Sequence, residues 1–221
     1  MVTQHSVHLS GLAGSVEYHY VVVSRDASGT AVTSGEKTFT TLGVVEEAVG
    51  QGWQLFETAA YTAALDKFQQ ASALEPHNIR VLEGLGWCEL QLYSFDESRA
   101  ALAEALSIQP SRLDCLVAAA FTYEALAQYP DAIVAAEHAL SLGGDSYVFA
   151  HSPDIKASDI RYCLVVSLAA TGDLIGALDQ AKHIDPTIVL DPDEPSTWDG
   201  YPTFEEALIA IMEHLRQLVQ G

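Results

Sequence analysis

A histidine and a group of carboxylates, all in predicted loops, are the residues of this chain that could carry acid–base or metal chemistry. His151 stands three positions before Asp154, a spacing that lets an imidazole and a carboxylate share a proton or hold a metal ion. Between the last two predicted helices lies an acidic segment whose oxygens would suit a hard cation such as Ca²⁺. Its carboxylates are those of Asp185, Asp191, Asp193, Glu194 and Asp199. The segment lacks the D-x-[DN]-x-[DN]-G spacing of a calcium-binding loop, and a single loop histidine is usually not catalytic. We therefore predict no metal site and no catalytic residue.

The other reactive side chains form no catalytic pattern either. The three cysteines, Cys88, Cys115 and Cys163, have unrelated spacings and no C-x-x-C pair, which argues against a disulfide framework and against a zinc site. We expect them to be small buried residues. The sequence has no G-x-S-x-G, no H-E-x-x-H and no phosphate-binding glycine loop. We therefore predict that the protein is not an enzyme and binds no cofactor.

The net charge of −20 restricts the partners of the chain. Residues 1–43 hold three acidic and two basic residues, so the remainder carries 27 acidic against eight basic side chains. Such a surface repels nucleic-acid phosphates and anionic lipid head groups, and we expect most of this charge on a solvated outer face. We find no apolar run that predicts a membrane span, and no signal-peptide pattern at the start of this sequence.

The elements that would position any site repeat with a period of 34 residues, the strongest pattern in the sequence. Gly52 and Gly86 are one period apart, and so are Pro76 and Pro110. Three further columns each extend over three repeats: Trp53–Trp87–Phe121, Tyr61–Phe95–Tyr129 and Ala71–Ala105–Ala139. Because independent columns share one spacing, the pattern indicates stacked structural units of two helices each.

This pattern resembles the tetratricopeptide repeat (TPR), whose signature is W-x2-L-G-x2-Y, then A-x3-F, then P. The first repeat carries the matching residues Gly52, Ala64, Phe68, Ala71 and Pro76. The resemblance covers residues about 44–186. It implies a mainly α fold, an α–α superhelix of about four TPR-type helix pairs with a C-terminal capping helix, preceded by a small N-terminal antiparallel β segment.

We expect two parts, a β segment at 1–43 and a TPR solenoid at 44–221. The predicted repeats of the solenoid are 45–78, 79–112, 113–144 and 157–186. An insert loop, residues 145–156, separates the third repeat from the fourth. An acidic loop at 187–202 leads to a last helix at 203–219, which we expect to cover the end of the stack, since a repeat array needs a cap.

Residues 1–43 read as β structure because apolar and polar residues alternate in them. His8–Leu12 predicts one strand, and two further runs joined by a turn at Asp26–Gly29 predict a hairpin. A lone hairpin is marginally stable in water, so we expect these strands to lean on the helices, on a second copy or on further parts of a longer protein.

This β segment resembles, over residues about 5–42, the last strands of a bacterial fibronectin type III domain. Leu12–Tyr18 stands where that family carries L-x-P-x-T-x-Y, its tyrosine corner. Gly14 replaces the proline of that motif and Val16 replaces the threonine.

In the TPR family the first helix of each pair lines a concave groove that holds a peptide. The resemblance places ten residues of this chain on that groove: Val49, Trp53, Phe56, Glu83, Trp87, Leu90, Val117, Phe121, Glu124 and Tyr162. The ladder Trp53–Trp87–Phe121 departs from the family, which usually has a polar residue there. Aromatic side chains dominate binding hot spots, so an open ladder would be a ligand site. In the alternative, the ladder is core, covered by the acidic loop with Trp198, by the last helix or by the N-terminal strands.

The resemblance implies a non-enzymatic scaffold of bacterial origin that binds a peptide or protein segment in this groove. We expect an apolar partner segment with basic flanks, which the carboxylates of Glu83, Asp114 and Glu124 would favour. The alternative is a structural or assembly module of a larger cell-envelope protein, a homo-oligomer formed through the strands in 1–43.

The insert loop resembles the F-x-H-x-P segment that some TPR proteins of bacterial cell envelopes insert. Its notable residues are Tyr147, Phe149, His151, Pro153 and Asp154. Separately, the joint resemblance to a fibronectin type III segment and to TPRs implies a parent protein that is exported or attached to the cell envelope. We find no targeting signal in the given sequence, so we make no prediction of its localisation.

Overall fold

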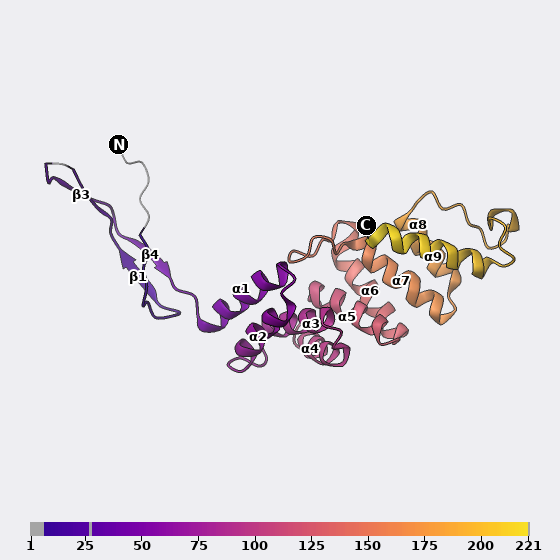
Figure 1. The fold of residues 1–221 in the computed structure, drawn as a ribbon, viewed down its shortest axis with the longest axis horizontal. Coiled ribbons are helices and arrows are strands. Elements are labelled where there is room, and N and C mark those ends of the chain that lie inside the picture. Colours follow the sequence, from indigo (N-terminus) through magenta and orange to yellow (C-terminus); the bar gives the residue numbers. More distant parts are fainter. Residues whose placement is uncertain (1–6, 27, 221) are drawn as a thin grey trace.

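The structure, a computed structural model, describes residues 7–26 and 28–220. A β-hairpin segment comes first and is followed by a stack of consecutive helix pairs (Figure 1). The first helices of the pairs are α1 (Val44–Glu57), α3 (Ile79–Gln91), α5 (Leu113–Ala125) and α7 (Ala157–Thr171). The second helices are α2 (Tyr61–Ser72), α4 (Phe95–Ile108), α6 (Tyr129–Gly143) and α8 (Leu174–Ile184).

The glycine column of the 34-residue repeat lies where the first helix of a pair touches the second. A Cβ atom at Gly52 would stand 2.8 Å from the ring of Phe68 on α2, and one at Gly86 would stand 2.5 Å from Leu102 on α4. Real Cβ atoms do not come so close, so glycine is what lets these helices approach. Phe68 and Leu102 are buried by that approach. The sequence repeat therefore follows from the packing inside each pair.

A further column with the same spacing lies in the turns inside the pairs, where the residue types gave no hint of it. Ala59, Tyr93 and Ala127 have positive φ angles of 58°, 62° and 55°. After each of them the next backbone N–H donates to the carbonyl five residues earlier, as in a Schellman turn. Gly172 has this role in the fourth pair, with φ of 89°. Side chains other than glycine are strained in this region by about 1 kcal/mol.

Replacing Ala127 by glycine is expected to raise the free energy of unfolding by about 0.5–1 kcal/mol, because glycine adopts a positive φ without strain. The methyl group of Ala127 is exposed, so little packing is lost. Urea denaturation measures the change. Ala100→Gly is the matched control, since Ala100 is an exposed residue inside α4 and glycine in a helix lowers stability by about 1 kcal/mol. A loss of stability in both variants would contradict the prediction.

The β segment is one long hairpin that projects from the α1 end of the stack (Figure 1). Strand β1 (Glu17–Tyr20) pairs antiparallel with β4 (Lys37–Thr40), and β2 (Val23–Arg25) pairs with β3 (Ala31–Thr33). The strand predicted at His8–Leu12 is wrong, since among the described residues the first strand begins at Glu17. Each described ladder has two strands only, so residues 8–12 do not add a third strand to either of them.

The region of the expected tyrosine corner contains one hydrogen bond of the kind that the motif makes. The backbone N–H of Ala13 donates to the hydroxyl of Tyr18 over 2.8 Å. The ring of Tyr18 stacks on Phe39 of the partner strand, with centroids 5.6 Å apart. A fibronectin-like sandwich needs two packed sheets, so the resemblance of this segment to that family stays a prediction.

Helix α9 (Phe204–Gln220) closes the other end of the stack. It packs on α7 and α8, and its Leu208 and Leu215 are buried against a small cluster that includes Val165 and Leu178. This is the predicted capping helix, and the mainly α fold class with a small antiparallel β segment is confirmed. Among the helices of residues 7–26 and 28–220, none is long and apolar enough to cross a membrane.

Candidate functional site

The first helices of the pairs lie next to one another, α1 against α3, α3 against α5 and α5 against α7. We call the surface that they share the inner face. All ten predicted groove residues lie on these four helices. Their burial differs, however: the residues on the α1 side are covered, and those toward α7 are partly open.

The insert loop covers the aromatic ladder at the α1 side of the inner face. It leaves α6 and its tip reaches back to α1 (Figure 1). The ring of Phe149 stacks on Trp87 with centroids 4.1 Å apart, and it lies 6.0 Å from Trp53 and 6.1 Å from Phe56. Phe149 is 0% exposed in this aromatic slot, and Trp53, Phe56 and Trp87 are buried too. In this structure Trp53 and Trp87 of the ladder are therefore covered core rather than part of an open groove.

The segment that covers the ladder is not one of the three that the sequence suggested. Trp198 lies with the α7–α9 cluster at the far end, where its Nε1 donates to the carbonyl of Asp191 over 2.8 Å. Helix α9 packs on α7 and α8, and the hairpin projects away from the stack. The prediction that one of these three segments covers the ladder is wrong, because the insert loop occupies that position.

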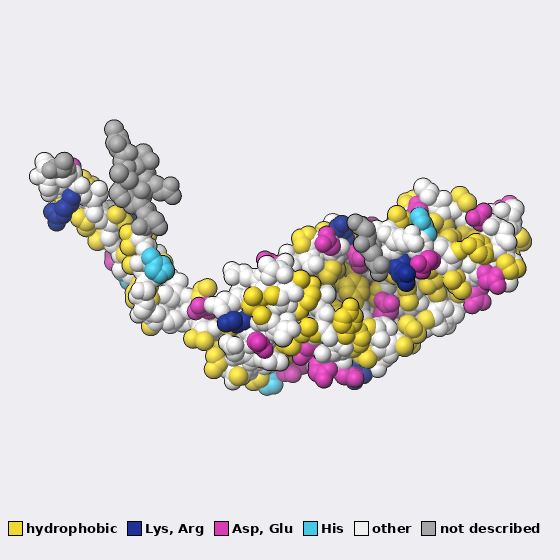
Figure 2. All heavy atoms as spheres, viewed as in Figure 1, with side chains coloured by type: hydrophobic (Ala, Val, Ile, Leu, Met, Phe, Trp, Pro, Cys, Tyr) yellow, Lys and Arg dark blue, Asp and Glu magenta, His cyan; other side chains and the backbone are white. Residues whose placement is uncertain are grey.

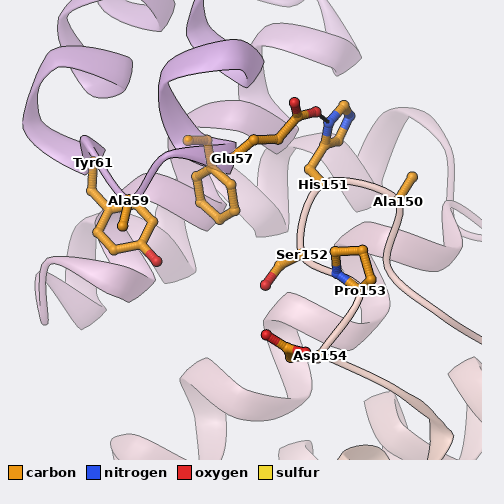
Figure 3. Close-up of a pocket in the computed structure, with 9 residues that line it drawn as sticks. Glu57, Ala59, Tyr61, Ala150, His151, Ser152, Pro153 and Asp154 are labelled. Atoms are coloured by element: carbon orange, nitrogen blue, oxygen red, sulfur yellow. Dashed lines mark hydrogen bonds and ion pairs between the residues drawn. The ribbon is translucent and has the colours of Figure 1, made fainter.

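His151 forms the second contact of the loop tip with α1. Its imidazole lies flat on the indole of Trp53, with centroids 4.0 Å apart and an interplanar angle of 3°. Its Nδ1 lies 2.8 Å from Oε1 of Glu57, the last residue of α1 (Figure 3). An imidazole with a proton on Nδ1 donates to this carboxylate, and a protonated ring adds an ion pair. The side-chain partner of His151 is therefore Glu57, and not Asp154, whose spacing in the sequence was considered and set aside as an acid–base or metal pair.

The base of the insert loop has its own anchors, separate from the tip. Val148 and Lys156 form an antiparallel bridge that closes the loop. The Tyr147 hydroxyl donates to Oδ1 of Asp114 on α5 over 3.0 Å. Asp145 accepts hydrogen bonds from the guanidinium of Arg161 on α7. The loop therefore stays attached at its base whatever its tip does.

Glu83 is a buried carboxylate, only 3% exposed, on helix α3 of the inner face. It accepts a hydrogen bond from Nε of Arg112, the residue just before α5. Burial raises the pKa of Glu83, and the Arg112 guanidinium opposes that shift. Glu83 in turn raises the pKa of Arg112. Glu83 and Asp114 were predicted to attract basic flanks of a ligand, but both are used inside the chain, Asp114 by the Tyr147 hydroxyl.

Two hollows remain open beside His151. The larger has a volume of about 510 Å³ and is lined by the end of α1, by Tyr61 and by loop residues 150–154 (Figure 3). The smaller, of about 340 Å³, is also lined by His151 and is bordered by Gln54, Arg80 and Arg112. Glu57 lines both hollows. Their mixed polar and apolar lining suits a peptide better than a purely apolar ligand.

The α7 side of the inner face is more open. Its predicted groove residues, Leu90, Phe121, Glu124 and Tyr162, are each half-buried. Phe121 touches the edge of Trp87 with ring centroids 6.5 Å apart, so the ladder continues from the covered slot onto this more open side. Burial raises the pKa of Glu124, and Tyr162 packs against the cluster under α9.

The three cysteines and the carboxylates of the acidic loop do not come together in one site. Burial raises the pKa of Cys88 to about 12 and raises those of Cys115 and Cys163 as well, so these thiols stay protonated near neutral pH. In the acidic loop, Asp185 and Asp191 accept hydrogen bonds from nearby backbone N–H groups. The described residues contain no cluster of three or more His, Cys, Asp or Glu side chains arranged to hold a metal ion.

Sequence reasoning missed the residues that complete this site: Glu57, Arg112 and the tip of the insert loop as a part of the inner face. Phe149 was noted only for the likeness of its segment, and His151 for that likeness and for its spacing from Asp154. A usable signal was present, since the insertion carries a large apolar ring, and a ring of this size is usually buried.

No protein-family model and no curated protein matches this sequence. Solved structures do share its fold. MamA MSR-1 superposes with a TM-score of 0.57 at 15% identity, over 78% of this chain and 97% of that chain. MamA AMB-1 gives a TM-score of 0.52 at 18% identity, over 65% of this chain and 72% of that chain. A tetratricopeptide repeat protein from Parabacteroides merdae gives 0.52 at 16% identity, over 79% of this chain and 60% of that chain.

At these identities the likeness shows the fold alone. It gives no support to a fibronectin type III segment at the N-terminus. With the helix pairs, the glycine column and the end cap described above, it leads to one conclusion: this chain has a helical-repeat fold of the tetratricopeptide type.

Proposed function

We propose that the protein is a non-enzymatic protein-interaction module whose inner face binds a segment of a partner protein. The observation that supports this proposal is that the inner face already holds a chain segment, the insert loop, through an aromatic slot and a carboxylate. Helical-repeat folds use surfaces of this kind for extended contacts with proteins. The ten predicted groove residues supply the slot and its continuation toward α7.

The charge distribution favours a partner segment with basic flanks. Acidic side chains are spread over the helical stack, whereas the hairpin shows few of them (Figure 2). Glu57 is the carboxylate that borders both open hollows, and its side chain is 48% exposed. Opposite charges at the rim of an interface mainly raise the association rate and select partners. We therefore expect binding of the partner to weaken as the salt concentration rises.

A substitution beside the hollows tests this function. Gln54 is exposed on α1 and lines the smaller hollow, so Gln54→Arg brings a cation to the place where basic flanks would lie. We expect it to lower the amount of partner captured from source-cell extract by at least about fivefold, since like charges across an interface are unfavourable. Gln70→Arg is the matched control, because Gln70 is exposed on the second helix α2. Equal capture by both variants would contradict binding at the inner face.

A second candidate function is self-association through the hairpin. Val21, Val22 and Val23 are each more than half exposed there, and they line an apolar hollow of about 590 Å³ with Tyr20 and Phe39. Exposed apolar surface and open strand edges are both typical of association sites. Residues 1–43 are also nearly neutral, so two hairpins can meet without the repulsion that two acidic stacks would feel.

Val22→Asp is expected to shift the protein from dimer to monomer in light scattering at tens of micromolar concentration, because it buries a charge in the proposed interface. Deletion of residues 1–43 should have the same effect. Val134→Asp on α6 is the control, since Val134 is also exposed, at 68%. A wild-type protein that is monomeric at all concentrations would remove this candidate.

A further inference from the structure

The tip of the insert loop contacts the inner face as a compact turn. The N–H of Ser152 donates to the carbonyl of Phe149 over 3.2 Å, so Phe149 and His151 are the first and third residues of a β-turn. Ile155 continues the closure, because its carbonyl accepts from the N–H of Phe149 over 2.9 Å. The exposed neighbours Val148 and Ala150 take no part in the contact.

The inner face offers this turn two adjacent subsites. The first is the aromatic slot, which buries the ring of Phe149 between Trp87, Trp53 and Phe56. The second is the flat stack of His151 on Trp53, with Glu57 at its edge. A planar, positively charged group suits the second subsite, since a ring face and a carboxylate both attract a cation. An aromatic residue followed two positions later by a histidine therefore fills both.

The turn is held on the inner face through two side chains, Phe149 and His151, and is bordered by open space. His151 lines both hollows, of about 510 Å³ and 340 Å³, and Pro153 and Asp154 beyond it are exposed. The loop base is fixed separately, by the Val148–Lys156 bridge, by Tyr147 and by Asp145. The tip can therefore leave the two subsites without the release of the rest of the loop.

We infer that the insert loop is an internal copy of the ligand, and that the inner face binds a β-turn of a partner protein with an aromatic first residue and a histidine or cationic third residue. This inference rests on the function proposed above and names the chemistry of its ligand. The partner turn takes the place of Phe149 and His151. Because the loop competes for the same subsites, the wild-type protein binds this ligand more weakly than a variant with an emptied slot.

The probe is a fluorescent cyclic peptide with the sequence of residues 148–156, closed at the ends that the Val148–Lys156 bridge joins. Cyclisation holds the turn and lowers the entropy lost on binding. Fluorescence anisotropy compares the wild type with the Phe149→Ala/His151→Ala variant, and we expect at least about tenfold tighter binding by the variant. Adding Glu57→Gln to the variant should weaken binding severalfold, and a peptide with alanine in place of its phenylalanine should not bind.

A folded variant that binds the peptide no better than the wild type would overturn the inference. If the double variant does not fold, Phe149→Leu replaces it, because leucine fills the slot without stacking on Trp87. If Phe149→Leu binds the peptide with the same affinity as the wild type, the inference is again overturned. The wild type and the double variant could also bind the peptide equally, with binding still weakened by Glu57→Gln. That result would overturn the inference that the ligand displaces the loop, and would leave the inner face as a binding surface. A dimer in an equimolar mixture of wild type and variant would show that the slot takes the loop of a second copy, and would overturn the assignment to a separate partner.

Discussion

Replacing Phe149 by alanine is expected to lower the free energy of unfolding by about 3–5 kcal/mol, the range for a buried aromatic side chain cut back to a methyl group. Phe149 is fully buried, and its ring is the only part of the insert tip that enters the slot between Trp53, Phe56 and Trp87. Its loss leaves a cavity lined by rigid aromatic rings, which collapse poorly. In thermal unfolding this corresponds to a fall of roughly 10 °C for a chain of this size.

The matched control for this variant is Val148→Ala, the preceding residue of the same loop. Val148 is 50% exposed, so its truncation should change the free energy of unfolding by less than about 0.5 kcal/mol. A loss of less than about 1 kcal/mol in Phe149→Ala would show that the loop tip contributes little to the folded state. Equal losses in the two variants would mean that the loop acts through its backbone rather than through the ring.

Replacing Arg112 by methionine is expected to lower the free energy of unfolding by about 3 kcal/mol. Removal of one partner of a buried ion pair typically costs about 3–5 kcal/mol because the other charge stays buried, and the partial exposure of Arg112 places this pair at the lower end. Glu83 is the charge left behind, with a side chain only 4% exposed. Chemical denaturation of both proteins at pH 8 measures the difference.

The loss of unfolding free energy caused by Arg112→Met should depend on pH. The pKa of Glu83 in the folded protein is raised above its usual value, so its contribution to stability is present below the unfolded pKa and is lost as the pH rises through the folded pKa. Without Arg112 the folded pKa rises further, so the variant loses more stability than the wild type on going from pH 5 to pH 8. A deficit that does not change with pH would contradict this account.

Two controls isolate the ion pair in this experiment. The double variant Glu83→Gln/Arg112→Met removes both charges and should recover most of the lost stability, as expected for coupled neighbours. Arg99→Met removes a comparable arginine whose partner Asp96 is 72% exposed, and it should cost less than about 1 kcal/mol. If Arg99→Met costs as much as Arg112→Met, burial of the pair is not the cause.

The helical part of the fold follows closely from the sequence, because each repeat column corresponds to a local packing requirement. Gly52 and Gly86 allow contact with Phe68 and Leu102, and helix pairs follow one another along the chain as the 34-residue period indicates. Local spacing carries this information. The column of positive φ angles at Ala59, Tyr93 and Ala127 was hidden, since alanine and tyrosine give no sign of a left-handed turn.

The candidate site was only half predictable. The resemblance placed Trp53, Phe56 and Trp87 together, and the structure does bring them to one slot. Their cover was missed because the contact between Glu57 and His151 joins residues 94 positions apart, and no repeat period describes an insertion. Long-range contacts of a loop depend on its length and on what it meets, and a single sequence reports neither.

The tether of the insert loop has a consequence for any partner of the inner face. Because the loop is anchored at both ends, its tip faces the slot at a fixed local concentration, on the order of millimolar for a short connection. Dilution of the protein cannot reduce this concentration. Occupancy by a partner is therefore set by the ratio of the partner's concentration and affinity to those of the tip. A longer loop lowers the local concentration of the tip, and with it the partner concentration needed to displace the tip, whereas a shorter loop raises both. Loop length therefore tunes partner binding without any change in the binding surface.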